Sequence, residues 1–271
     1  MTFNQDPPDG ARLLQTVSTT LQIISLLEEH NGATAIELTE ELDVSKSAVY
    51  SHLTTLADHD FVSKQGKTYQ LSFRFLTLGE FVRNESVLYR HGREQVEQLS
   101  ENTGEYAHLT VEQNGLGVNV YKTRGRDAVG EEFQNERLQK PDFLHYSATG
   151  KSILAHLPEE RVDAIINEHG LPRRTEQTIT DRDALYKELE MVREQGFAYN
   201  DGEEVRGIRA VGAPILTKDQ TVLGAVSVSG PRSRVGGKRY ESELPSTVKS
   251  AANVIEVNLN TAMTDREFPS F

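Results

Sequence analysis

The chain has 271 residues and no cysteine, and its 41 Asp and Glu against 29 Lys and Arg give a formal net charge of −12. This length favours two domains, each able to bury its own core, while the lack of cysteine excludes disulfides and cysteine-ligated metal sites. Because the first residues are polar and no run of about 18 apolar residues occurs, we expect neither a secretory leader nor a membrane span, and therefore a cytoplasmic protein without membrane contact.

The first predicted element is a helix over residues 12–30, preceded by a disordered tail over residues 1–10, which is rich in Pro and Asp. The Asn31-Gly32 pair ends the helix, because glycine readily adopts the left-handed C-cap conformation. Aliphatic residues recur in it at helical spacing: Leu13 or Leu14, Val17, Leu21, Ile24 and Leu27.

Two further helices are predicted between residues 35 and 58. Each has apolar residues at spacings of three and four, which indicate an inward-facing stripe. Ser45 lies at the start of the second helix, where its hydroxyl can accept a hydrogen bond from a backbone N–H. The two stripes consist of Ile36, Leu38 and Leu42, and of Val49, Leu53 and Leu56.

A hairpin is predicted next, with strands over 61–64 and 68–71 around a polar turn at 65–67. Helix, turn, helix and hairpin in this order indicate a winged helix-turn-helix over residues 11–72. The second helix of such a domain can enter the major groove of double-stranded DNA. The alternative is a helical module that contacts other proteins.

Polar side chains on the outer face of the second helix, and lysines on the wing, favour DNA over the protein-contact alternative. From residue 44 to residue 74 the balance of basic and acidic side chains is about +2, on a chain that is otherwise acidic. The candidate DNA-contacting residues are Lys46, Ser47, Tyr50, Ser51 and Thr54 on the helix, and Lys64 and Lys67 on the wing.

The overall negative charge does not exclude this partner. The acid excess is either an ordinary soluble surface or an adaptation to high salt, where screening shortens to a few ångströms. Arg outnumbers Lys, which favours the second interpretation, a halophilic source. A protein that stayed folded and soluble in low-salt buffer would contradict that interpretation.

Residues 73–90 predict a linker helix that is too apolar for an exposed spacer. Phe75, Leu76, Leu78, Phe81 and Val82 lie within it. A surface of this kind usually has a partner, and we expect it to form a homodimer. Two identical recognition helices then read the two halves of a palindromic operator.

Residues 91–263 mix helices and strands, which predicts an α+β domain with a central antiparallel sheet and helices on one side; a loose tail is expected over 264–271. The Asn114-Gly115 pair marks a hairpin turn. The predicted strands are 106–113, 117–123, 205 onward, 208–216 and 222–229, and the predicted helices are 92–102, 152–157, 158–169, 181–195 and 243–263.

The sequence GKS at 150–152 does not form a phosphate-binding loop. That motif needs a glycine five residues before the Gly-Lys pair, and His145 stands there. A helix N-terminus at this point still suits a small anion such as a carboxylate. No histidine pair has metal-ligand spacing and no nucleophile motif occurs, so we expect no metal, no cofactor and no catalytic residue.

Ser227 and Ser229 alternate to one face of a predicted strand. They line either a polar cavity or an ordinary half-exposed strand, and residue patterns alone leave both open. The acidic segment 200–204 is predicted as a loop that closes over a pocket with these serines and the helix start at 148–150.

Taken together, these segments resemble the IclR family of bacterial and archaeal transcriptional regulators over nearly the whole chain. The resemblance rests on LTEELDVSKSAVYSHLTTLADHDFV, SATGKSILAHLP, EQGFAYNDGEEVRGIRAVGAPI and AVSVSGPRSR in this order. It implies a winged helix-turn-helix, a linker helix and a GAF-like domain that binds a small effector, often a carboxylate, in dimers and often tetramers. The effector-binding positions that it implies are Ala148, Thr149, Asn200, Ile208, Ala210, Ser227 and Ser229.

Two positions depart from the family pattern. Asn200 stands where some carboxylate-binding members have Asp, and Ala210 stands where family members have Cys. A neutral amide at position 200 is more favourable to an anion. The predicted function is a one-component transcriptional repressor or activator, controlled by an organic or sugar acid. The alternative is an enzyme or ligand-binding signalling protein whose helical head contacts proteins.

Overall fold

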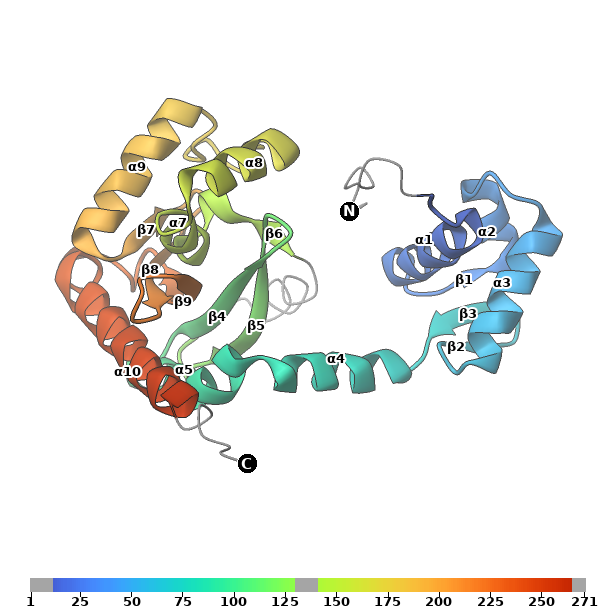
Figure 1. Ribbon diagram of the computed structural model, residues 1–271, viewed down its shortest axis with the longest axis horizontal. Helices are drawn as coiled ribbons and strands as arrows, with labels where there is room; N and C mark the ends of the chain where they lie inside the picture. Colours follow the sequence, from blue (N-terminus) through green and yellow to red (C-terminus); the bar gives the residue numbers. More distant parts are fainter. Residues whose placement is uncertain (1–11, 130–140, 265–271) are drawn as a thin grey trace. The chain divides into compact units, whose positions relative to one another are not determined.

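The computed structural model describes residues 12–129 and 141–264, and the chain separates into two compact units, Met1–Val82 and Arg83–Phe271 (Figure 1). The two predicted tails, 1–10 and 264–271, lie outside the described residues except for Thr264, which ends a helix. Each unit is described by itself below.

The first unit is a winged helix-turn-helix, as predicted. Its three strands pair antiparallel in the order β1-β3-β2. The Ser45 hydroxyl accepts from the backbone N–H of Ala48, 3.3 Å away, and so caps the recognition helix α3. The elements are α1 (Gln15–Glu29), β1 (Ala33–Thr34), α2 (Ala35–Glu41), α3 (Lys46–Asp58), β2 (Val62–Gln65) and β3 (Thr68–Leu71).

Some residues of the predicted apolar stripes are exposed rather than part of the core of this unit. Ile23 and Leu27 of α1 are buried, but Leu14, Val17 and Leu21 are 65%, 51% and 58% exposed. α1 therefore packs on α2 and α3 with a neighbouring face, because its aliphatic surface is wider than these short helices can cover. In α2 the prediction also fails for Ile36, which is exposed.

The predicted linker helix is two helices. α4 (Arg74–Glu85) ends before Ser86, whose extended backbone and hydroxyl, which accepts from the N–H of Tyr89, begin α5 (Val87–Thr103). Tyr89 is buried in the second unit, whereas no residue of α4 is buried.

The second unit contains a six-stranded sheet in the order β6-β5-β4-β9-β8-β7, with every neighbouring pair antiparallel. Asn114 and Gly115 both have positive φ and form the predicted two-residue turn. The strands are β4 (Tyr106–Gln113), β5 (Leu116–Arg124), β6 (Asp142–Phe143), β7 (Ala198–Asp201), β8 (Ile208–Leu216) and β9 (Val222–Pro231).

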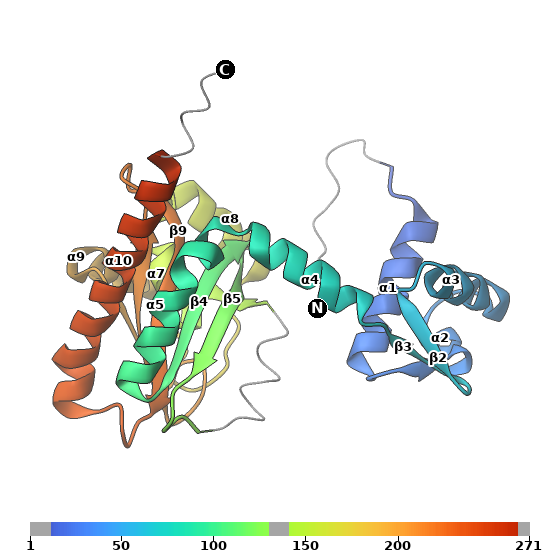
Figure 2. The same cartoon turned by 90° about the horizontal axis from the view of Figure 1, so that it is seen from below.

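Helices cover both faces of this sheet (Figures 1 and 2), so the predicted one-sided arrangement is wrong. α5 and α10 pack on one face, and α7, α8 and α9 form a second core on the other. Val211 and Val228 face the first core, whereas Gly212 approaches the backbone of Ala148 in α7. The helices and turns are α7 (Ala148–Leu154), α8 (Glu159–His169), α9 (Arg182–Gln195) and α10 (Leu244–Thr264), with a 3-10 turn at Leu144–Tyr146 and a π-helical turn at Arg239–Glu243.

Two predicted boundaries shift. α7 begins at Ala148 rather than at 152, because the Ser147 hydroxyl accepts from the N–H of Gly150 at 3.0 Å and caps the helix. Asn200 belongs to β7 rather than to a loop, and the next strand begins at Ile208 rather than at Val205.

Candidate functional site

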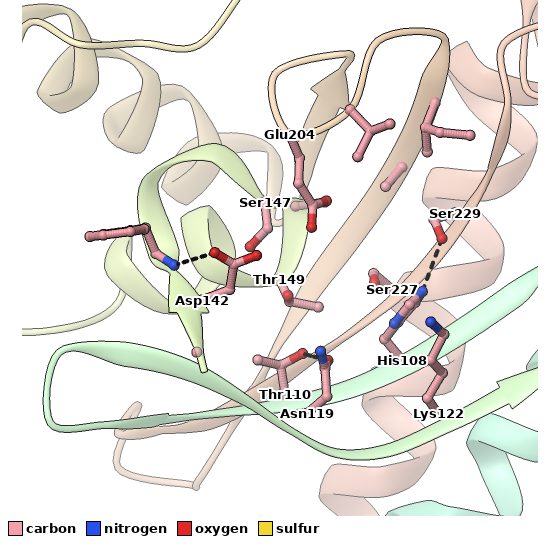
Figure 3. A pocket seen from close by; sticks show the side chains of 16 residues that line it. His108, Thr110, Asn119, Lys122, Asp142, Ser147, Thr149, Glu204, Ser227 and Ser229 are labelled. Carbon is pink, nitrogen blue, oxygen red and sulfur yellow. Dashed lines mark hydrogen bonds between the residues drawn. The ribbon is translucent and has the colours of Figure 1, made fainter. Parts of the chain in front are cut away.

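A small, partly open cavity lies in the second unit, between the α7 face of the sheet, the start of α7 and the segment 204–208. Figure 3 shows Glu204 pointing into it from the side opposite to Thr110 and Asn119. It offers about 60 Å³ to the centres of water-sized molecules. Its lining consists of His108, Thr110, Gly117, Asn119, Lys122, Asp142, Phe143, Ser147, Ala148, Thr149, Glu204, Val205, Ile208, Ala210, Ser227 and Ser229.

The sheet forms a floor of hydrogen-bonding side chains. His108 Nε2 lies 2.9 Å from Ser229 Oγ, and the Thr110 hydroxyl donates to Asn119 Oδ1 at 2.9 Å. Ser227 and Ser229 are buried in β9, at 4% and 8% exposure. The polar-cavity interpretation of these serines is therefore the correct one, and the half-exposed strand is excluded.

The wall opposite the floor begins with α7. Ser147, Ala148 and Thr149 line the cavity. In the first helical turn the Ser147 hydroxyl caps the N–H of Gly150, whereas the N–H groups of Ala148 and Thr149 have no acceptors within the helix. A small anion is suited to this position.

Charges of both signs surround the cavity. Lys122 is the cation, and Asp142 and Glu204 are carboxylates. Asp142 also accepts hydrogen bonds from the Tyr146 hydroxyl and from the N–H of Phe143. A ligand here meets donors as well as acceptors, which favours a molecule that combines a carboxylate with hydroxyl groups.

Six of the seven effector positions predicted from the resemblance line the cavity: Ala148, Thr149, Ile208, Ala210, Ser227 and Ser229. The structure does not bring the seventh, Asn200, to it. The Asn200 side chain is 1% exposed; its Nδ2 donates to the carbonyl of Tyr146 at 2.8 Å, and its Oδ1 accepts from the N–H of Glu203 at 3.0 Å. The Asn200 side chain therefore links the backbone of Tyr146 to that of Glu203, behind the cavity wall.

Sequence reasoning missed the polar floor on β4 and β5. His108, Thr110, Asn119 and Lys122 lie on strands that alternation predicted correctly, but no role was assigned to them. The available signal was the alternation of His108 and Thr110 with the apolar residues Ala107, Leu109 and Val111 in β4. The sequence contains no nucleophile motif, yet the fold places the Ser229 hydroxyl within hydrogen-bond distance of His108, which motif spacing could not predict.

The predicted DNA-contacting residues are all exposed in the first unit. Lys46, Ser47, Tyr50, Ser51 and Thr54 are all exposed on α3, as are Lys64 and Lys67 at the wing. The Ser51 hydroxyl donates to the Ser47 carbonyl at 3.0 Å. The Lys64 ammonium lies 5.2 Å from the centre of the Tyr69 ring, which holds it at the wing.

Within residues 12–129 and 141–264, no helix is long and apolar enough to cross a membrane. In the same part of the chain, no three His, Asp or Glu side chains are grouped in a way that could hold a metal ion.

Comparison with known proteins gives matches to both units. Residues 16–66 match the IclR helix-turn-helix domain, and residues 84–257 match the family described as "Bacterial transcriptional regulator IclR C-terminal". Among curated proteins, a probable HTH-type transcriptional regulator, ArcR, of Halobacterium salinarum is 40% identical over 93% of this chain and 96% of that protein. The regulator XynR of Escherichia coli is 29% identical, over 82% of this chain and 88% of that protein.

Solved structures agree with this fold. The Thermotoga maritima IclR crystal structure has a TM-score of 0.73 and 26% identity, covering 91% of this chain and 99% of that one. An IclR homolog of Microbacterium hydrocarbonoxydans, complexed with 4-hydroxybenzoate, has a TM-score of 0.76 at 18% identity, covering 91% and 98% of the two chains.

Proposed function

Because the chain belongs to the IclR family of transcriptional regulators, we propose that its cavity binds a small hydroxylated carboxylic acid, such as a sugar acid, that controls DNA binding. The protein is a DNA-binding transcriptional regulator with a C-terminal effector domain. The similarity to a Halobacterium regulator is consistent with the halophilic source expected from the acidic composition. As a regulator of transcription, it would act in the cytoplasm.

The observation that carries the proposal is the distribution of donors and acceptors around the cavity. Lys122, the α7 start and the Thr149 hydroxyl can donate to a carboxylate, while Glu204 and Asp142 can accept from ligand hydroxyls. An aromatic acid would leave these carboxylates facing a ring. A hydroxy acid or sugar acid satisfies both sets.

The direct test is a thermal-shift screen of the full chain in concentrated KCl against acetate, pyruvate, D-galacturonate and 4-hydroxybenzoate. A ligand at 100 times its dissociation constant stabilises the folded state by about 2.7 kcal/mol. We expect D-galacturonate, the sugar acid of this set, to raise the melting temperature most. A shift with 4-hydroxybenzoate alone would contradict the proposed class.

Filling the cavity is expected to abolish that shift. Ala210 is 5% exposed and lines the cavity, so Ala210→Leu places three further carbons in the space that the ligand needs. Ser227→Ala keeps the space and removes one hydroxyl, and should weaken binding only about tenfold. An unchanged ligand-induced shift in Ala210→Leu would place the ligand elsewhere.

The recognition helix and wing are expected to contact phosphates through their lysines. Lys46→Ala and Lys67→Ala should each lower the slope of log affinity against log salt by about one, uniformly across DNA sequences. Fluorescence anisotropy with the protein's own upstream DNA measures this, with Lys187→Ala at an exposed position of α9 as the control. An unchanged slope would remove that lysine from the phosphate contacts.

The expected homodimer on a palindromic operator remains part of the proposal. α4 has no buried residue, and Phe73, Leu76, Phe81 and Val82 are each more than 60% exposed. Aliphatic residues of α1 are exposed as well. Apolar surface of this extent on the DNA-binding unit supports self-association through this unit. A pairing of dimers into tetramers would appear as a doubled mass in light scattering after size exclusion.

The hydrogen bond between His108 and Ser229 supports one competing function, an enzyme with a serine nucleophile and a histidine base. The named relatives are regulators, and we propose that this pair orients the ligand. Incubation with 4-nitrophenyl acetate should therefore give no product beyond that of the Ser229→Ala variant. Serine-dependent turnover would favour the enzyme.

A further inference from the structure

A cluster of one lysine and two glutamates lies behind the cavity, in which Lys151 and Glu203 are buried and Glu188 is partly exposed. Lys151 of α7 is 1% exposed; its Nζ is 2.8 Å from Glu188 Oε1 of α9 and 2.7 Å from Glu203 Oε1. Lys151 does not line the cavity, but Glu203 directly precedes Glu204, which does. The cluster therefore connects two helices to the wall of the candidate effector site.

The charge of Glu203 depends on Lys151. Burial raises the pKa of the Glu203 carboxyl, and the neighbouring Lys151 ammonium opposes that rise. Within the described residues, Glu203 Oε2 has no hydrogen-bond partner. A buried carboxylate that loses its cation is strongly destabilised, and moving it into water relieves the cost.

The backbone before the cavity wall is held by neutral hydrogen bonds. The Thr175 hydroxyl donates to the Gly202 carbonyl at 2.7 Å, and the Thr178 hydroxyl donates to the Glu203 carbonyl at 2.7 Å. Asn200 accepts from the N–H of Glu203. Beyond Glu203, Asn200 Nδ2 donates to Glu204 Oε2 at the longer distance of 3.4 Å, and the Arg232 N–H donates to the Gly207 carbonyl at 2.8 Å. The place of Glu204 in the wall therefore depends in part on where the adjoining Glu203 side chain can remain.

We propose that Lys151 is a positioning residue of the effector site: by neutralising Glu203 inside the protein, it keeps the segment 203–208 against the cavity without touching the ligand. This inference rests on the proposed effector cavity. When Lys151 is removed, Glu203 turns toward water and carries Glu204 and Ile208 away from their places in the wall.

Hydrogen–deuterium exchange of the full, ligand-free chain tests this. In Lys151→Met, the amides of residues 203–208 should exchange on the order of a hundredfold faster, from the penalty of an unpaired buried charge, while those of β9 stay within about threefold of the wild type. The double variant Lys151→Met with Glu203→Gln has no charge at position 203 to expel, and the remaining Glu188 side chain is 22% exposed and can stay solvated, so the exchange of 203–208 should return toward the wild-type rate. Lys187→Met, on the exposed face of α9, is the matched control.

Unchanged exchange of 203–208 in Lys151→Met would overturn the inference, as would an equal increase in β9, which indicates general unfolding. A double variant that exchanges as fast as the single one would also overturn it, because packing rather than charge would then be responsible. If Lys151→Met does not fold, a folded double variant with wild-type exchange supports the inference, and an unfolded one refutes it. No ligand is needed, so the result is independent of the organic-acid screen.

Discussion

Replacing Gly150 with alanine is expected to lower the free energy of unfolding of the effector unit by about 3 kcal/mol or more. A Cβ atom at this position would lie 2.1 Å from the carbonyl oxygen of Leu144 and 2.5 Å from its Cα. These are backbone atoms and cannot rotate away, and the site is buried. Either α7 or the preceding turn must shift; α7 carries Ala148 and Thr149 of the cavity lining, and the turn is flanked by Phe143 and Ser147, which also line it.

Gly196→Ala provides the matched control in the same unit. Gly196 follows α9 in the left-handed region, with φ +76° and ψ +22°, and an added Cβ would meet only the end of the flexible Lys249 side chain, at 3.2 Å from Nζ. The substitution therefore carries mainly the cost of left-handed backbone, about 1 kcal/mol. Scanning calorimetry of both variants in the same KCl buffer separates the two effects. Equal losses of unfolding free energy in the two variants would show that the protein accommodates the added Cβ at position 150 without a steric cost.

The glycine in GKS shows what the sequence could and could not predict. The residue pattern excluded a phosphate loop, because His145 occupies the required glycine position. It could not supply the actual reason for a glycine at position 150, which is contact with Leu144. That contact depends on a tight 3-10 turn immediately before α7, and such turns leave no periodic signal.

The strands of the sheet also differ in how well the sequence predicted them. Alternation and turn residues predicted β4 and β8 at their observed bounds, because these strands are long and flanked by clear turns. β6, with two residues, and β7, with four, are too short for a pattern to appear. The placement of helices on both faces was missed because β8 and β9 carry small or hydroxyl residues toward α7, and such a face resembles solvent-exposed surface.

Asn200 illustrates the limit of resemblance. The family pattern places this position in the effector site, and local polarity agreed with a loop over the pocket. In the structure its amide binds the carbonyl of Tyr146, 54 residues away in the sequence. No local pattern encodes such a pairing, and a substitution from Asp to Asn at an anchoring position says little about the charge of the ligand.

The apolar surface of α4 gives the second large expected effect. Substitution of glutamate for both Leu78 and Phe81 should convert the proposed dimer into a monomer. Binding to palindromic DNA should weaken at least a hundredfold, because two connected DNA-binding units no longer read the two half-sites together. Leu78 and Phe81 are 42% and 65% exposed within one chain, and glutamate is a good helix former. The stability of the monomer should therefore change by less than about 0.5 kcal/mol.

Light scattering after size exclusion gives the mass, and anisotropy on the upstream DNA gives the affinity. The control is Gln113→Glu with Gln177→Glu, which adds the same two carboxylates at exposed positions of the effector unit; it should keep both the mass and the affinity. If the α4 variant keeps the wild-type mass, the exposed surface of this helix does not hold the copies together. If its mass halves and the affinity is unchanged, a single head is sufficient for the operator, and the reason for a dimer must lie in the response to the effector.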